Sequence, residues 1–265
     1  MKIGGSIVTE KNRTGVFIRR KLLTEIAKDC AAALSVNKNI QLIIIHGAGS
    51  AAHQVAKQYQ LENGTKNDSM KIEGAQLIHV ANQKLNLAIA EIFLNHGVNI
   101  APVHTASVII QRGGKINKCF YDVIDQALGS NCVPLLYGEI VFDETLGMTI
   151  CSGDVIAVDL AKKYNASKIV FVSDIDGIFD KDPHVYRDAI IIKSITLDSI
   201  TTNNKVTLSG SHNVDVTGGL KNKIAVLSGN DIPKSLKQVV VCNGFSAGFI
   251  SRAFNDIDDG TIIQI

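Results

Sequence analysis

The stretch IQLIIIHGAGSAAHQVAKQYQ, residues 40–60, decides the fold class of this chain. Its first part, residues 40–45, is almost wholly apolar or β-branched, which is typical of a buried strand. After the turn HGAG, residues 50–60 follow helical spacing, with Ala51, Val55 and Ala56 on one side. A strand that passes through a glycine-rich turn into a helix is the unit from which parallel α/β sheets are built.

The same alternation continues along the chain. Further strands are predicted at 99–103, 133–136, 168–173 and 238–242, and further helices at 73–95, 154–163 and 221–228. The helix at 73–95 is predicted to bury an apolar side that includes Leu77, Val80 and Leu85. Turn residues at 113–118 and 141–149 predict hairpins. We expect one α/β domain over residues 1–265, with a mainly parallel central sheet and two lobes, about 1–140 and about 141–265.

Composition excludes several classes of protein. Hydrophobic residues make up 46% of the 265, which is enough for a large buried core. The 27 basic residues nearly balance the 25 acidic ones, and this balance disfavours a protein that binds nucleic acid or membrane surfaces. No apolar run reaches the ~18 residues of a membrane span, and the first residues do not resemble a signal peptide. The five cysteines are scattered without a C-x-x-C pair, which disfavours a disulfide framework or zinc cluster. We expect a cytoplasmic protein.

Glycines gather where predicted strands end. They occur in GGS at 4–6, HGAGS at 46–50, SGD at 152–154, DG at 176–177 and TGG at 217–219. Glycine lets backbone N–H groups approach a phosphate, and a helix that starts just after such a turn adds a favourable dipole. Because ligands of open α/β sheets bind at the carboxyl ends of strands, these turns predict a phosphate-binding edge.

Two common nucleotide motifs do not explain these turns. The P-loop pattern is absent, since GGK at 113–115 lacks the earlier glycine and the Ser or Thr. Residues 47–52 fit G-x-G-x-x-A, but a dinucleotide site also needs a second strand that ends in an acidic residue about 20 positions on. Residues 62–73, ENGTKNDSMKIE, are polar and loop-like. A dinucleotide oxidoreductase is therefore disfavoured.

Charged residues beside the glycine turns indicate phosphoryl transfer. Lys2 precedes the first turn, Lys11 follows it, and Lys223 lies in the helix after TGG. Phosphoryl transfer depends on positioning and on neutralising the charge of the transferred group, which compact lysine charges provide. Asp154 either begins a helix as an ordinary first-turn carboxylate, or holds lysines in position or assists magnesium.

The histidines do not predict a metal site. His46 and His53 are seven residues apart, which does not match H-E-x-x-H zinc geometry. From its position alone, His53 either packs or caps a helix, or it contacts a ligand. We expect no metal bound by protein side chains.

Several motifs follow one another along the chain: KIGGSIVTEK at 2–11, HGAGSAAH at 46–53, VPLLYGE at 133–139, SGD at 152–154, SDIDGI at 173–178 and DVTGGLKNK at 215–223. In this order they resemble the amino acid kinase superfamily, and within it most closely the isopentenyl phosphate kinases. The resemblance implies a three-layer αβα sandwich in which the N-terminal part holds a phosphate acceptor and the C-terminal part holds ATP. It also implies a homodimer, with Mg²⁺ held mainly by the nucleotide phosphates.

The resemblance further implies a role for each matching residue. Catalysis falls to Lys2, Lys11, Asp154 and Lys223, where Lys11 stabilises the transition state and Asp154 organises the lysines. The nucleotide is bound by Lys2, Gly4, Gly5, Ser6, Gly49, Asp174, Asp176, Gly177, Gly218 and Lys223. The acceptor is bound by Ala48, Gly49, His53, Ser152 and Gly153, with His53 on the acceptor phosphate.

The acceptor loop departs from the family pattern. Ala48 stands where the family has glycine, and residues 51–52 are Ala-Ala where it has Phe-Gly. From the motifs as a whole we nevertheless expect an ATP-dependent kinase, with isopentenyl phosphate as the best-matching acceptor. The alternatives are a fosfomycin-type or acylated amino acid kinase of the same superfamily, and a non-catalytic nucleotide-binding protein. Retention of all four catalytic residues favours an enzyme over the last of these.

Overall fold

The computed structural model describes residues 1–265 except 11–16, 182–184, 203–218, 229–231 and 255–259. The chain forms two compact units. The N-terminal unit comprises Ile3–Gly153, and the C-terminal unit comprises Met1–Lys2 together with Asp154–Ile265. The short strand β1 (Lys2–Ile3) thus contributes one residue to each unit.

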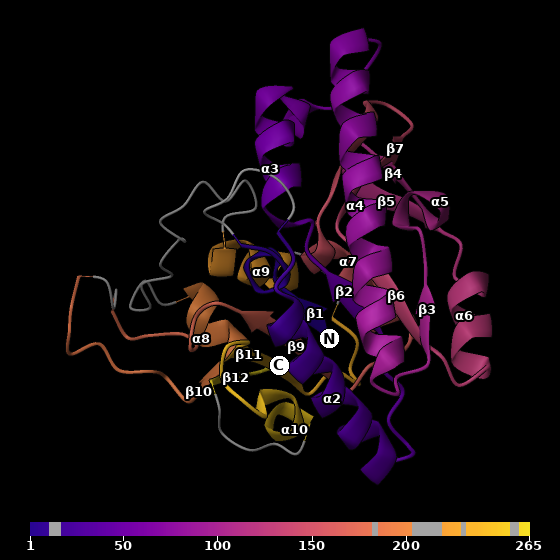
Figure 1. The fold of residues 1–265 in the computed structure, drawn as a ribbon. Helices are drawn as coiled ribbons and strands as arrows, with labels where there is room; N and C mark the ends of the chain where they lie inside the picture. The colour runs from indigo at the N-terminus through magenta and orange to yellow at the C-terminus, as the bar shows by residue number, and fades with distance from the viewer. Residues whose placement is uncertain (11–16, 182–184, 203–218, 229–231, 255–259) are drawn as a thin grey trace. The chain divides into compact units, whose positions relative to one another are not determined.

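The N-terminal unit is built on parallel strands in the order β2 (Ile44–His46), β6 (Val133–Tyr137), β3 (Ile100–Pro102). The long helix α4 (Ser69–Asn95) packs against β3 and β6, and the helices α2 (Arg20–Val36) and α3 (Gly49–Gln58) pack against α4 (Figure 1). The short helix α1 (Gly5–Val8) contacts α2 and α3, and α6 (Asp122–Gly129) packs on β6. The strand predicted at 40–45 is shorter, because only residues 44–46 pair with β6.

A second sheet of the same unit has the order β5-β4-β7-β8. It contains the two predicted hairpins, which are confirmed as the antiparallel pairs β4 (Ile109–Arg112) with β5 (Lys115–Cys119) and β7 (Glu139–Asp143) with β8 (Gly147–Cys151). The short helix α5 (Thr105–Val108) precedes β4, and the 3-10 turn η1 (Leu61–Asn63) lies between α3 and α4.

The C-terminal unit carries strands in the order β10 (Ser194–Thr196), β12 (Thr261–Gln264), β11 (Gln238–Asn243), β9 (Lys168–Ser173). The pairs β10–β12 and β11–β9 are parallel, and β11–β12 is antiparallel. Its helices are α7 (Gly153–Lys163), α8 (Leu197–Thr202), α9 (Gly219–Ser228) and α10 (Phe249–Phe254). The predicted α/β class with mainly parallel strands is therefore confirmed.

Helix α4 buries only part of the side that its apolar spacing predicted, including Leu85, Ile89 and Ile92. Leu85 is buried, but Leu77 and Val80 are 48% and 52% exposed. Three polar residues are buried instead: His79, Asn82 and Asn86. A helical face is chosen by what packs against it, so tertiary contacts override the apolar pattern here.

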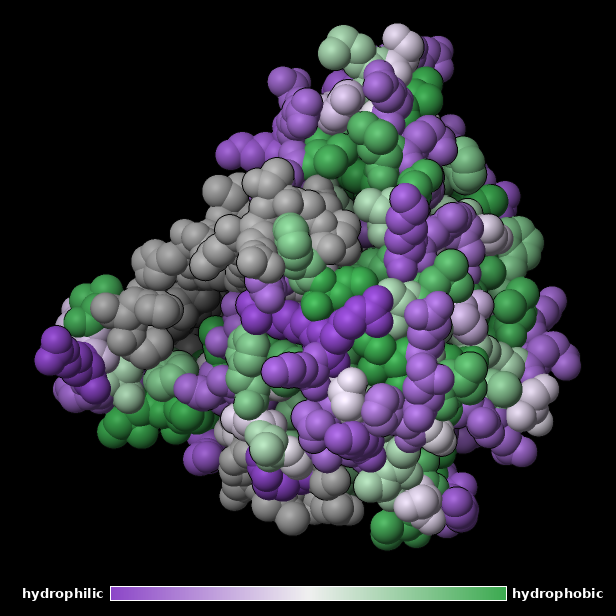
Figure 2. All heavy atoms as spheres, in the orientation of Figure 1, coloured by the Kyte–Doolittle hydropathy of each residue, from purple (hydrophilic) through white to green (hydrophobic). Residues whose placement is uncertain are grey.

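The surface combines polar and apolar side chains. On the face shown in Figure 2, charged and polar side chains are interspersed with apolar ones. Within the described ranges, none of the helices combines the length and the apolar character that crossing a bilayer requires.

Candidate functional site

Two glycine-rich turns of the N-terminal unit pack directly against each other. Gly47, just after β2, lies so close to the first turn that a β-carbon built on it would be 2.5 Å from the Gly5 nitrogen. Only glycine permits this approach of two backbones. The Gly47 N–H also donates to the Ile3 carbonyl at 2.8 Å. The turns at 4–6 and 46–50, far apart in the sequence, therefore form one backbone surface.

Thr9 joins these turns through its hydroxyl group. Its Oγ1 accepts a hydrogen bond from the Ser50 N–H at 3.0 Å and donates to the Gly5 carbonyl at 3.1 Å. Gly49 has a φ of +75°, and a β-carbon there would meet Thr9 side-chain atoms at 2.8 Å. Glycine is needed at position 49 for both reasons. Thr9 was not predicted as a site residue, although it belongs to the motif at 2–11.

Arg19 supports the first turn from outside any motif. Its Nε lies 3.1 Å from the Ser6 carbonyl and 3.2 Å from the Thr9 carbonyl and donates to both. These bonds fix the carbonyl groups of Ser6 and Thr9. No sequence signal marks this residue, because it contacts the turn through backbone atoms that any residue type would supply.

His53 projects from α3 toward the first turn. Its Nε2 would be 3.9 Å from a β-carbon built on Gly5. Ala48, which precedes α3, has φ −68° and ψ −12°, a conformation that alanine adopts without strain. The replacement of the family's glycine at position 48 therefore leaves the backbone of the loop intact. Ala52 is buried, whereas the side chain of Ala51 lies outside the described part of the chain.

Gly153 and Ser152 lie beside the end of β6. A β-carbon on Gly138 would be 2.9 Å from the Gly153 nitrogen, and the Gly138 N–H donates to the His46 carbonyl at 2.9 Å. The start of α7 is thereby placed next to the ends of β2 and β6 within the N-terminal unit. Ser152 is half-buried at this junction.

The C-terminal unit holds a buried cluster of three charges. The Lys2 ammonium lies 3.0 Å from Asp154 Oδ1 as an ion pair, and Lys223 Nζ donates to Asp154 Oδ2 at 3.1 Å. All three residues are buried, at 7%, 3% and 7% exposed. Lys223 also lies over the Phe171 ring, 5.7 Å from its centroid. The cluster carries a net charge of +1 and brings together three of the four predicted catalytic residues.

The charge state of Asp154 follows from its neighbours. Burial alone would raise the pKa of this carboxyl, but the charges of Lys2 and Lys223 outweigh burial and hold its pKa below the usual range. Each oxygen of Asp154 therefore faces one ammonium group.

The remaining predicted nucleotide residues lie after β9. Asp174 is half-buried, and its Oδ1 accepts a hydrogen bond from the Ser173 hydroxyl at 3.4 Å. Asp176 is exposed and accepts from Asn243 Nδ2 at 2.7 Å. Gly177 packs against Thr261, whose Oγ1 accepts from the N–H of residue 178 at 2.7 Å. The predicted residues Lys11 and Gly218 lie outside the described residues.

Comparison with known proteins decides the family. Residues 1–228 match the family model described as the amino acid kinase family. The chain belongs to the amino acid kinase family. It is therefore an ATP-dependent phosphotransferase, as predicted.

Relatives of this kinase agree in fold and in length. It is 32% identical to an isopentenyl phosphate kinase from Methanocaldococcus jannaschii, over 100% of this chain and 97% of that protein. It is 28% identical to the enzyme of the same name from Methanothermobacter thermautotrophicus, over 86% of this chain and 84% of that one. A crystal structure of isopentenyl phosphate kinase superposes with a TM-score of 0.80 at 23% identity, covering 99% of this chain and 98% of the other.

Proposed function

We propose that this kinase transfers the γ-phosphoryl group of ATP to isopentenyl phosphate. The observation that carries the proposal is the position of His53 on α3. Its ring lies toward the glycine turns, while its neighbour Ala52 is buried in an apolar cluster. An acceptor with a phosphate head and a short hydrocarbon tail requires these two surroundings side by side.

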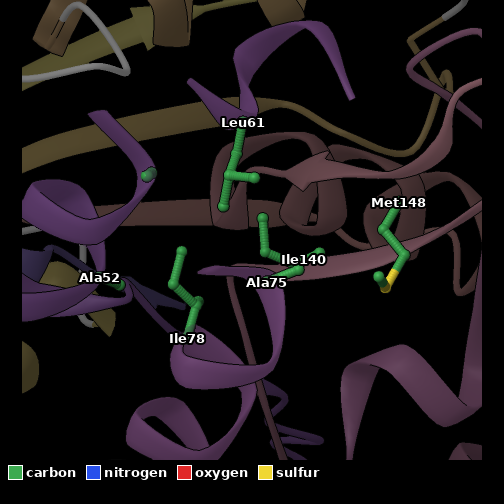
Figure 3. Close-up of a cluster of buried hydrophobic side chains, with 7 residues drawn as sticks. Ala52, Leu61, Ala75, Ile78, Ile140 and Met148 are labelled. Carbon is green, nitrogen blue, oxygen red and sulfur yellow. The ribbon is translucent and has the colours of Figure 1, made fainter. Parts of the chain in front are cut away.

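The apolar cluster lies in the N-terminal unit (Figure 3). Its buried side chains come from α3, η1, α4, β7 and β8: Ala52, Ala56, Leu61, Ala75, Ile78, Ile140 and Met148. Val55 and Ala48 pack against it from the same helix and its cap. An isoprenoid chain gains about 0.8 kcal/mol per buried methylene in such surroundings. A carboxylate acceptor such as an acylated amino acid would gain less from them.

On this proposal, His53 donates to the acceptor phosphate, and the N–H groups near Ala48, Gly49, Ser152 and Gly153 bind the same group. A dianionic phosphate favours the protonated imidazole, whose ordinary pKa is about 6.5. Ala52, which stands where the family has glycine, contributes a methyl group to the apolar cluster.

The charged cluster supplies the electrostatic part of the reaction. Lys2 and Lys223 neutralise oxygens of the transferring phosphoryl group, and Asp154 holds both ammonium groups in place. Lys11 stabilises the transition state of phosphoryl transfer. Gly4, Gly5 and Ser6 contact ATP phosphates, as does Gly49, and Asp174, Asp176, Gly177 and Gly218 bind the nucleotide. We further infer a homodimer, for which the exposed apolar side chains of α4 offer a contact surface.

An acceptor screen tests the proposal. Release of ADP is measured with isopentenyl phosphate, dimethylallyl phosphate, fosfomycin and acylated amino acids, and kcat/KM is expected to be highest for isopentenyl phosphate. Highest kcat/KM for fosfomycin or an acylated amino acid would overturn the proposal within the same family.

Two variants of His53 sharpen the test. With isopentenyl phosphate, kcat/KM should fall in the order wild type, His53→Gln, His53→Ala, because glutamine keeps a neutral donor, while KM for ATP stays nearly constant. His96→Ala serves as control, since His96 bonds the Ile92 carbonyl at the far end of α4. Melting temperatures of all variants are measured in parallel. A change in melting temperature without a change in acceptor kinetics would show that His53 only packs.

A further inference from the structure

Two histidines and a glutamate meet in the N-terminal unit, away from His53. His79 comes from the middle of α4, His104 from the residue before α5, and Glu139 from the first position of β7. These elements pack on one another, since both α4 and α5 contact β7 (Figure 1). One potential ligand atom of each side chain lies within 4.8 Å of the others.

The cluster contains buried polar atoms without partners. Glu139 is 2% exposed, and its Oε1 accepts from Asn82 Nδ2 at 3.0 Å and from the Ile140 N–H at 2.8 Å. Its Oε2 and His79 Nδ1 have no hydrogen-bond partner within the described part of the chain. His79 Nδ1 lies 3.6 Å from Glu139 Oε1. A buried carboxylate oxygen without a donor costs stability, and a bound cation would remove that cost.

The neighbours of the cluster orient it as the outer residues of metal sites do. His104 Nδ1 bonds the Ser107 hydroxyl at 2.8 Å, and its Nε2 bonds the amide of Gln83 at 3.0 Å. Gln83 is exposed and can rotate away, which leaves a route from solvent to the imidazole. Burial raises the pKa of Tyr137, and the charge of Glu139 and hydrogen bonding to Glu139 raise it further.

We propose that His79, His104 and Glu139 form a Zn²⁺ site. Two imidazole nitrogens and one carboxylate oxygen are a ligand set that Zn²⁺ accepts, whereas Mg²⁺ prefers oxygen ligands alone. With metal–ligand bonds of about 2.0–2.2 Å, small side-chain rotations bring the three atoms into reach of one ion. Three protein ligands would leave a fourth position for water.

The site would brace the acceptor-binding part of the molecule. Asn82, which holds Glu139, also donates to the Gly138 carbonyl at 3.3 Å, and Gly138 lies against Gly153. A metal ion at Glu139 would tie α4 and the loop before α5 to the start of β7. The main expected effect is thus on the stability of the N-terminal unit, and it does not depend on which acceptor the kinase uses.

Metal titration of the purified full-length protein, stripped with chelator and measured without ATP, tests the proposal. Calorimetry should show one Zn²⁺ per chain, and Zn²⁺ should raise the melting temperature while Mg²⁺ does not. Co²⁺ in place of Zn²⁺ should give visible d–d absorption without the charge-transfer band of a cysteine thiolate. Absence of stoichiometric Zn²⁺ binding, or a thiolate band, would overturn the proposal.

Variants locate the site. His104→Ala and Glu139→Gln should each weaken Zn²⁺ binding by about 10–100-fold or more, and His96→Ala, which changes another histidine of the same region, should not. Because Glu139 is buried, circular dichroism is used to check that Glu139→Gln folds. If that variant does not fold, the test rests on His104→Ala, since His104 is only half-buried. Wild-type affinity in folded His104→Ala would refute the assignment.

Discussion

Two buried carboxylates of this kinase have opposite surroundings. Asp154, 3% exposed, has a lysine ammonium at each oxygen. Glu139, 2% exposed, has neutral donors at one oxygen and two histidines nearby. Lysine keeps its charge at neutral pH, so the balance around Asp154 is permanent. The charge balance around Glu139 can change when a cation binds. Replacing the carboxylate by an amide should therefore have different effects at the two sites.

Replacement of Asp154 is expected to have the largest effect. Asp154→Asn keeps the shape but leaves two buried ammonium groups without a counter-charge, and breaking a buried pair in this way costs about 3–5 kcal/mol. Turnover should fall strongly as the lysines move apart. Thermal unfolding and kcat measure the two effects, and a variant of wild-type stability would contradict the account of the cluster.

Loss of one lysine should reduce turnover more than stability. On the proposed function, Lys223→Met removes a charge aimed at phosphoryl oxygens, and the loss of such a group costs about 10²–10³ in kcat. Lys234→Met is the matched control, since Lys234 is exposed. Steady-state kinetics at saturating substrates measure the effect; equal turnover in both variants would place phosphoryl transfer elsewhere.

Asp143 offers a third environment, without any lysine. Burial would raise its pKa, but N–H groups of Gly114, Thr145, Leu146 and Gly113 outweigh burial and lower it. The stabilisation is complete above the ordinary pKa of about 3.9 and is lost as pH falls below it. Asp143→Ala should cost about 1–3 kcal/mol at pH 7, because the four N–H groups lose their acceptor. The difference in stability between wild type and Asp143→Ala should become smaller in acid, because the wild-type carboxylate is then protonated. Melting curves of both proteins between neutral and acidic pH measure this, and a difference that stays constant would contradict the prediction.

Glu139→Gln should have the smallest effect in metal-free protein. The amide keeps an acceptor for Asn82 and removes a buried charge, so we expect a change of about 1 kcal/mol or less. Melting temperatures without added metal test this. A loss as large as that of Asp154→Asn would mean that the metal-free protein already compensates the Glu139 charge.

Local sequence predicted much of this molecule. The strand-turn-helix pattern at 40–60 and the hairpins at 113–118 and 141–149 appear in the structure with modest shifts of their ends. Apolar runs and glycine turns are local properties, and a short segment carries them whatever surrounds it. Lys2 and Lys223 could likewise be singled out from their positions beside glycine turns, and the structure places both against Asp154.

Tertiary structure alone decided which side chains meet. Residues of α4 with the apolar spacing of a core face, Leu77 and Val80, are exposed, because the strands pack on the face of His79 and Asn82 instead. The sequence analysis predicted that Asp154 holds lysines in position, and the contact itself forms only when β1, α7 and α9 are folded together. Sequence spacing can reveal a metal site only when its ligands share one helix or one turn. His79, His104 and Glu139 come from three different parts of the chain, so their spacing gave no sign of a cluster. The candidate residues could thus be chosen from local sequence, whereas their contacts were set by packing between distant segments.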